Sequence, residues 1–211
     1  MTSTMIEDVL EFWYPDDTFH RSQEDFTAWI FERMQGGMDE AICTRFADLT
    51  KAAARGELDD WAGTPRGRLA LLLVLDQFPR SLWRDTPGAF AQDIKACRLA
   101  LEGYRNGHFE TYAPWEKLFF VIALGHCEGP DHLERFNVID EMTETIVAEL
   151  PEHLNNAKER LCAQNERVRG IIERFGRHPH RNPILGRLST PEEEDYIAAG
   201  DFPHVQAQPT V

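Results

Sequence analysis

The sequence has few cysteines and no long apolar segment. Its four cysteines form no Cys-x-x-Cys pair, a pattern typical of reduced, buried thiols rather than of a disulfide framework. The longest apolar runs cover residues 69–75 and 118–124, far short of the roughly 20 residues that a membrane span needs. The N-terminus also lacks the basic stretch and apolar segment of a secretory signal. We therefore expect a cytoplasmic protein with no membrane partner.

Basic residues are scarce relative to acidic ones. The chain has 22 Lys and Arg against 36 Asp and Glu, a formal net charge of −14. Such a surface repels nucleic acid, so we expect no nucleic-acid partner. No glycine-rich phosphate loop or dinucleotide fingerprint is present, and we expect no cofactor. One late segment departs from this balance, with the basic and histidine residues Arg167, Arg169, Arg174, Arg177, His178, His180, Arg181 and Arg187.

Strand patterns are missing, and helix patterns recur along the whole chain. No alternating apolar run is bounded by hairpin dipeptides, whereas apolar residues repeat at helical spacing throughout. A hydrophobic content of 42% in 211 residues is enough for one well-buried core. The sequence predicts an all-α fold, a single domain over residues 1–211 with eight or nine helices, and a frayed tail from about residue 200.

Capping patterns predict where several helices begin. Thr4 followed by Glu7, and Thr190 followed by Glu193, both fit the capping box, in which two side chains bond to backbone amides. Thr64 precedes a proline, which is the favoured pair at a helix start. These positions predict helix starts at residues 4, 64 and 190.

Two predicted helices are apolar on every side. Residues 69–75 and 118–124 are apolar on every side, so we expect the helices over residues 65–78 and 114–126 to be buried at the centre of the fold. A third predicted helix, residues 152–175, repeats apolar residues every seven positions and is expected to pack across them. Gly176 then supplies the residue that a left-handed helix cap favours.

Four separate segments together resemble a known bacterial family. They are Phe12-Trp13-Tyr14, Leu75-Asp76-Gln77-Phe78-Pro79-Arg80, His126-Cys127-Glu128, and residues 175–190. Across nearly the whole chain they are similar to the family catalogued as domain of unknown function 924. The resemblance implies an all-helical, tetratricopeptide-like fold and supplies no assigned activity. The chain departs from the family's usual residues at Cys127, His178 and Val168, where Ser, Phe and His are more common.

The loop from Gly176 to Arg187 is the clearest candidate for a binding site. Its glycines and prolines fix the backbone, and its arginines match carboxylates and phosphates in pairs of hydrogen bonds. We expect these residues to bind a small anionic ligand or a peptide carboxylate. The candidate ligand-binding residues are Arg80, Trp83, Arg177, Arg181, Asn182 and Arg187.

An alternative assigns the same arginines to the interior. Asp76 ends an apolar helix, so its carboxylate would be partly buried and would need a partner, and Glu128 is in a similar position. The arginines would then form ion pairs that hold the fold together. Both interpretations stay open, because the wall of a binding pocket can consist of such pairs.

Catalysis and metal binding are the other chemical possibilities. For an enzyme acting on an anionic substrate, the acid or base candidates are Asp76, Glu128, His178 and His180. For a metal-assisted version, the weak candidates are His126, Glu128, His178 and His180. Spacings of two residues do not share one helix face, so we expect no metal. Cys127, beside His126, is expected to be a buried structural thiol rather than a nucleophile.

Three function classes follow from these observations. The first is a binding protein for a small anion or carboxylate, the second a hydrolase-like enzyme, and the third a structural or oligomeric protein without a ligand. The loop of residues 176–187 favours the first class narrowly. The sequence leaves the ligand and the oligomeric state open.

Overall fold

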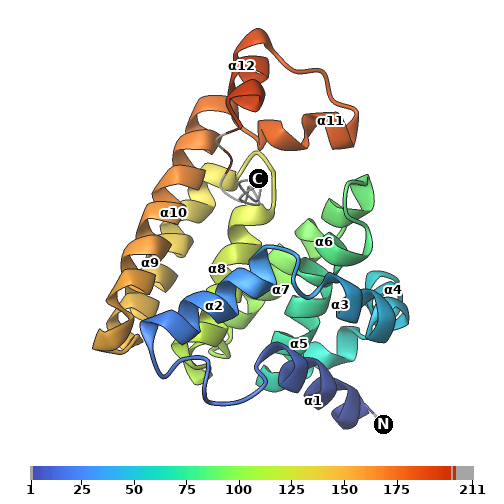
Figure 1. Ribbon diagram of the computed structural model, residues 1–211. Helices are drawn as coiled ribbons and strands as arrows, with labels where there is room; N and C mark the ends of the chain where they lie inside the picture. Colours follow the sequence, from blue (N-terminus) through green and yellow to red (C-terminus); the bar gives the residue numbers. More distant parts are fainter. Residues whose placement is uncertain (1, 201, 203–211) are drawn as a thin grey trace, which may run out of the picture.

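The computed structural model describes residues 2–200 and residue 202, and those residues form helices and no strand (Figure 1). This confirms the all-α prediction. The predicted frayed tail lies almost wholly outside the described residues. The α-helices of the first half are α1 (Thr2–Trp13), α2 (Gln23–Met34), α3 (Asp39–Arg45), α4 (Ala47–Ala54), α5 (Pro65–Asp76) and α6 (Phe78–Leu82).

The second half contains longer helices and the segment that follows them. Its α-helices are α7 (Asp93–Arg105), α8 (Pro114–His126), α9 (His132–Glu149), α10 (Asn155–Phe175), α11 (Asn182–Leu185) and α12 (Pro191–Ala199). Short 3-10 helices include η2 (Pro87–Phe90) and η5 (Pro179–Arg181). The helices outnumber the expected eight or nine partly because expected helices divide, one at Phe46 and one at Gln77. No helix in the described part of the chain has both the length and the apolar character that a membrane span requires.

The predicted helix starts are confirmed at two positions and wrong at one. Thr64 Oγ1 accepts the amide of Gly67 at 3.2 Å, so it caps α5. Thr190 and Glu193 form the reciprocal capping box at the start of α12. Thr4 caps nothing, because α1 already begins at Thr2 and Thr4 lies in its first turn.

The helix is interrupted between α5 and α6, and this interruption positions Arg80 beside Asp76. The proline at position 79 was expected to end the helix, but α5 ends earlier, at Asp76, and Pro79 lies in the first turn of α6. A proline is tolerated there because the first amides of a helix have no acceptor within it. The break leaves Arg80 one turn beyond Asp76, and the Arg80 guanidinium donates to the Asp76 carbonyl.

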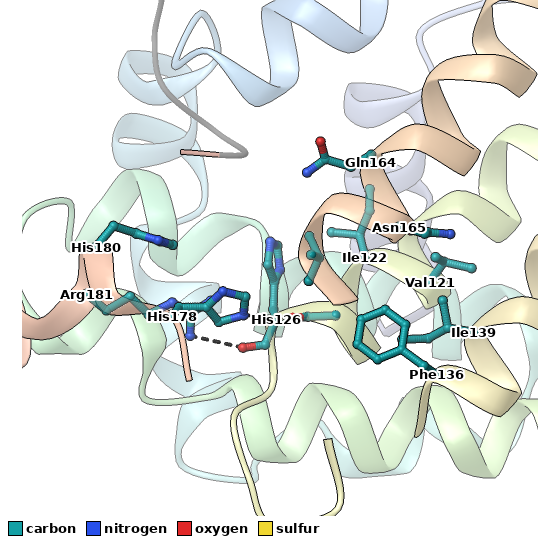
Figure 2. Close-up of a pocket in the computed structure, with 12 residues that line it drawn as sticks. Val121, Ile122, His126, Phe136, Ile139, Gln164, Asn165, His178, His180 and Arg181 are labelled. Atoms are coloured by element: carbon teal, nitrogen blue, oxygen red, sulfur yellow. Dashed lines mark hydrogen bonds between the residues drawn. The ribbon is translucent and has the colours of Figure 1, made fainter. Parts of the chain in front are cut away.

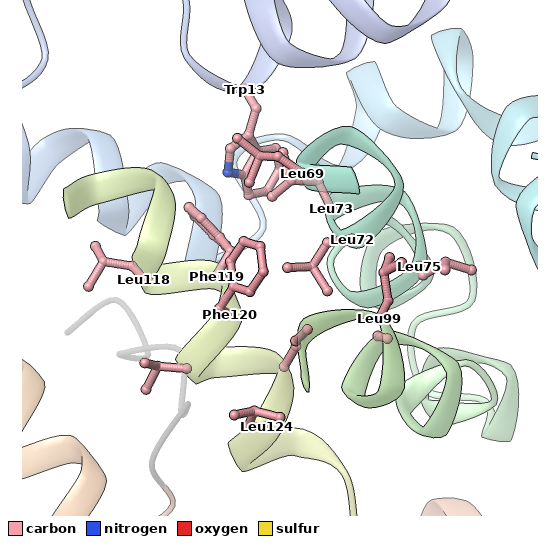
Figure 3. Packing of buried hydrophobic residues seen from close by; sticks show 14 of the residues in the cluster. Trp13, Leu69, Leu72, Leu73, Leu75, Leu99, Leu118, Phe119, Phe120 and Leu124 are labelled. Atoms are coloured by element: carbon pink, nitrogen blue, oxygen red, sulfur yellow. The ribbon is translucent and has the colours of Figure 1, made fainter. Parts of the chain in front are cut away.

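The core lies between α5, α7 and α8 (Figure 3). Leu72, Leu73 and Phe120 are fully buried, which confirms that α5 and α8 are central. Gly103 allows α7 to approach them closely, since a Cβ there would lie 2.9 Å from Phe120 and 2.7 Å from the side chain of Arg68. The packing of α5 and α8 therefore fixes the positions of their C-terminal residues, Asp76 and His126.

The long helix α10 packs differently from the prediction. It was expected to cross α5 and α8, but its main partners are α9 and α2. Its buried residues Val168, Ile171 and Ile172 lie near its C-terminal end, while the seam of its first turns is only half-buried. Gly176 ends it with a φ of 69°, as predicted. The chain then turns back over the C-terminal end of α8 (Figure 1).

Candidate functional site

Four segments that are far apart in the sequence meet at one end of the core. They are the end of α5 with α6, the start of α7, the end of α8, and the loop of residues 176–187. Each contributes charged or imidazole side chains that are mostly buried. We call this meeting point the junction.

The carboxylate of Asp76 holds the imidazole of His126. Asp76 is 1% exposed, and His126 Nδ1 lies 2.9 Å and 3.1 Å from its two oxygens. Gln77 Nε2 donates to the same carboxylate, and Arg80 Nη2 lies 3.5 Å from it. Because a carboxylate can only accept at these distances, the His126 Nδ1 carries a proton. Such pairing fixes the ring orientation and its tautomer.

Asp93 at the start of α7 joins two arginines. Its Oδ1 accepts from Arg80 Nη2 at 3.0 Å, and its Oδ2 accepts from Arg181 Nη1 at 3.0 Å. Arg181 Nη1 also donates to the His126 carbonyl at 3.0 Å, and its guanidinium lies 4.5 Å from the ring centroid of Phe90. We call the connected set of Asp76, Arg80, Asp93, His126 and Arg181 the inner cluster.

A second set of ion pairs lies further along the loop. Arg187 donates to both oxygens of Glu128, at 2.5 Å and 3.2 Å, and its Nε donates to Asn182 Oδ1 at 2.9 Å. Arg177 donates to both oxygens of Glu193 at 2.7 Å. We call these five residues, Glu128, Arg177, Asn182, Arg187 and Glu193, the outer clamp.

The carboxylates of the outer clamp are strongly stabilised as anions. Burial raises the pKa of Glu128, but the hydrogen bonds from Arg187 and from the His178 amide outweigh it and hold the pKa below its usual value. The hydrogen bonds of Arg177 lower the pKa of Glu193 to about 2, against a smaller opposing effect of burial. Both carboxylates are therefore charged at neutral pH, and the outer clamp is fully ionised.

A small cavity lies between the loop, α8, α9 and α10 (Figure 2). Its volume is about 40 Å³, which exceeds the 10–15 Å³ or so that a single water needs on this measure. Imidazole and guanidinium groups of His126, His178, His180 and Arg181 form one side of it. The remaining lining residues are Val121, Ile122, Gly125, Phe136, Ile139, Gln164, Asn165 and Val168.

Three polar atoms of the lining residues have no hydrogen-bond partner among the residues that the structure describes. They are Arg181 Nε, His178 Nδ1 and Gln164 Nε2, and all three are buried. His178 Nε2 lies 3.0 Å from the Gly125 carbonyl, so that nitrogen carries the proton and Nδ1 is an acceptor. Burial, followed by the nearby charge of Arg181, lowers the pKa of His178 well below its usual value. The cavity thus presents two donors and one acceptor.

A further buried histidine adjoins this wall. Both ring nitrogens of His132 lack a partner, and its ring centroid lies 5.7 Å from that of His178. Burial, followed by the charge of Arg135, lowers the pKa of His132 to about 4. His132, Asp93 and Gln164 were not among the sequence candidates. The packing of α7, α9 and α10 brings these three residues to the site, and no sequence motif marks them.

The remaining candidates lie around the cavity rather than on it. Trp83 is half-buried at the end of α6, and Arg80, Arg177, Asn182 and Arg187 bond to the clusters above without lining the cavity. The Cys127 thiol is buried and donates to the Glu128 carbonyl at 3.7 Å.

The metal candidates do not converge. Among the described residues, no group of three or more His, Cys, Asp or Glu side chains is placed to hold a metal ion. His126 bonds to Asp76, Glu128 bonds to Arg187, and His178 bonds to Gly125. These three residues take part in the junction through these contacts, and the fourth candidate, His180, lines the cavity.

A family model and a solved structure both match the chain. The model of the family described as "Bacterial protein of unknown function (DUF924)" matches residues 9–201. The chain belongs to this family. A solved structure of a protein of unknown function from Agrobacterium tumefaciens is 32% identical, with 95% of this chain and 100% of that chain covered and a TM-score of 0.70. No curated protein matches the chain. Membership of the family therefore gives the fold and no activity.

Two residues that the sequence analysis singled out within the family resemblance line the cavity. His178 stands on its polar side, and Val168 lines it from α10. Cys127 follows the cavity wall residue His126 in the chain, and its thiol donates to the Glu128 carbonyl at 3.7 Å.

Proposed function

We propose that the protein binds a small anionic ligand in the cavity beside the inner cluster, with a carboxylate as the group that fits best. The supporting observation is the convergence of Arg181 Nε, Gln164 Nε2 and His178 Nδ1, three buried atoms without a protein partner, on one cavity. A buried polar atom without a partner costs about 1–3 kcal/mol. Native proteins therefore supply such atoms with water or a ligand.

The two donors match the two oxygens of a carboxylate. The bond from Arg181 would be charge-assisted, and such bonds are about twice as strong as neutral ones. His178 Nδ1 would accept a hydrogen bond from a water molecule beside the carboxylate or from a hydroxyl on the ligand. Although the protein is acidic overall, Arg181 places a positive charge at this cavity. Arg181 is 4% exposed and shares the Asp93 carboxylate with Arg80.

The test measures thermal unfolding of the full chain with acetate, lactate and inorganic phosphate. A ligand present at about 100 times its Kd stabilises the native state by about 2.7 kcal/mol, which raises the Tm of a protein of this size by about 5–10 °C. We expect acetate and lactate to give larger shifts than phosphate, because the two donors of the cavity match the two oxygens of a carboxylate.

Two variants of the cavity and one of the outer clamp make the test specific. Arg181→Lys keeps a charge near Asp93 but loses Nε, and Gln164→Leu removes a donor without touching an ion pair. Both should lose the ligand-induced shift, while Arg187→Lys should keep it. If no anion shifts the Tm, or if all three variants respond as the wild type does, the proposal is wrong and the arginines serve structure alone.

A second candidate function is general acid–base catalysis. It is favoured by the Asp76–His126 pair, in which a buried carboxylate orients a ring that lines the cavity. This is the arrangement by which enzymes prepare a histidine to take a proton from substrate or water. The inner cluster would then act on the anionic ligand that the cavity binds.

Hydrolysis of carboxylate and phosphate esters tests this second candidate. A positioned general base contributes typically 10²–10⁴-fold to a rate, so His126→Gln should lower any activity by about that factor. The Arg187→Lys variant, in the outer clamp, is the matched control and should keep the activity. An activity that survives in His126→Gln does not come from this pair.

A further inference from the structure

An apolar groove lies beside the cavity, between α2 and α10. Its volume is about 430 Å³, within the range of small-molecule sites. It shares three lining residues with the cavity, Ile122, Gln164 and Asn165, so the two spaces meet at one wall. Asn165 is hydrogen-bonded to Thr143. Gln164 is the shared polar residue whose Nε2 has no partner among the described residues.

We propose that the ligand is an unbranched aliphatic monocarboxylate whose carboxylate enters the cavity and whose hydrocarbon chain lies in the groove. The inference rests on the proposed function and names its ligand class. Gln164 lines both spaces. Arg181 and His178 line the cavity, whereas the lining of the groove is largely apolar.

The groove has the lining that a hydrocarbon chain requires. Helix α2 contributes Phe26, Ile30, Phe31 and Met34, α8 contributes Leu118 and Ile122, and α10 contributes Ala157 and Leu161. Phe31 is 49% exposed, so the groove leaves a large apolar side chain in contact with water. Methionine adapts its shape to irregular partners, as Met34 could do beside a flexible chain.

The charges at the groove favour an anion over a neutral hydrocarbon. Arg160 stands on its exposed rim, on the face of α10 that borders the groove. No acidic side chain lines the groove or the cavity in the described part of the chain. On a protein with a net charge of −14, a lining that holds arginine and no carboxylate repels an anion less than an acidic surface does.

The test is isothermal titration of the full chain with straight-chain carboxylates from acetate to decanoate, each below its micelle concentration. Burial of one methylene increases affinity by about threefold to fourfold. We expect the Kd to fall by about that factor for each added carbon until the chain fills the groove, and then to stay constant.

Three variants assign the gain to the groove. Phe31→Glu places a negative charge at the groove without disturbing the core, and Ala157→Phe fills part of the space. Both variants should remove most of the affinity that each added carbon contributes, while acetate should bind as it does to the wild type. Met5→Glu is the matched control, because Met5 is 36% exposed on α1 and does not line the groove. It should behave as the wild type does.

The outcomes separate this inference from the proposed function. If acetate and lactate bind but affinity does not change with chain length, the cavity is a site and the hydrocarbon inference is wrong. If long carboxylates bind equally to Phe31→Glu, Ala157→Phe and the wild type, their binding is non-specific and the inference is also wrong. If sedimentation shows that Phe31→Glu disrupts a dimer and affinity does not change, a second copy of the chain covers the groove instead.

Discussion

The inner cluster and the outer clamp are built from the same kinds of residue, yet they differ in what they leave unpaired. In the outer clamp, Arg187 bonds with its Nε and both terminal nitrogens, to Asn182, Glu128 and the His178 carbonyl. In the inner cluster, Arg181 shares one carboxylate with Arg80 and keeps a buried Nε without a partner.

This difference separates an arginine that can only stabilise the fold from one that can also bind a ligand. A guanidinium whose donors are all used inside the protein can hold a loop in place, but it has nothing to offer a ligand. A buried guanidinium with an unused donor beside a cavity carries a cost that a ligand can remove. The two hypotheses for the arginines therefore apply to different members of the same loop. The structural hypothesis describes Arg177 and Arg187, and the binding hypothesis depends on Arg181.

The largest expected effect is on Asp93, which is the carboxylate that the inner cluster shares. Asp93→Asn should destabilise the protein by about 3–5 kcal/mol, because it leaves Arg80 and Arg181 short of a buried negative charge. Urea unfolding measures the change. The control is Asp48→Asn, which breaks an exposed pair with Lys51 and should cost less than about 1 kcal/mol. Equal costs for the two variants would remove the distinction between buried and exposed pairs.

His132 should make the stability depend on pH. Its pKa is about 4 in the folded protein against about 6.5 when unfolded. The unfolded chain therefore binds the proton first, and stability falls as the pH drops from about 6.5 to 4, by up to about 3 kcal/mol. His132→Phe keeps the stacking on Phe136 and removes the titrating group. Unfolding curves at pH 7.5 and pH 4.5 should show a smaller difference for the variant. Identical differences would mean that His132 does not titrate in this range.

An intermediate effect is expected in the outer clamp. Arg187→Lys keeps a positive charge near Glu128 but loses the paired geometry and the bond to Asn182. We expect a loss of about 1–3 kcal/mol, because the Glu128 carboxylate is largely buried. Chemical unfolding measures it. An unchanged stability would show that the loop does not depend on this clamp.

The smallest expected effect is on Glu193. Its folded pKa of about 2 lies below the unfolded value near 4.5, so its contribution is present above pH 4.5 and is lost as the pH falls toward 2. Glu193→Gln should cost about 1–2 kcal/mol at pH 7, since it weakens both the bond to Arg177 and the capping box. At pH 2 the variant and the wild type should unfold alike. A constant difference at both pH values would contradict the role of the charge.

The helices could be predicted from the sequence because their signals are local. Thr64 and Thr190 cap their helices, and Gly176 ends α10, through contacts within a few residues. The apolar character of residues 69–75 also predicts their burial. The break at Gln77 could not be read in this way, because Pro79 fits the end of one helix and the first turn of the next equally well.

The junction could be predicted only in part. Arg181 and Asp76 stand out because a basic loop and a buried carboxylate are unusual in their settings. Asp93 does not, since an acid in the first turn of a helix is common, and its role depends on packing that joins residues 88 positions apart. Gln164 is one polar residue on a long polar helix. Its importance follows from where α10 lies, which its heptad pattern predicted wrongly.

The most direct test of the account is a crystal of the protein grown with 10-bromodecanoate, with the anomalous signal of bromine used to locate the end of the chain. The account predicts a carboxylate oxygen about 3 Å from Arg181 Nε and the bromine between α2 and α10, beside Phe31 or Leu161. A ligand bound through Arg177 or Arg187, or a crystal in which the cavity and the groove hold water alone, would contradict it.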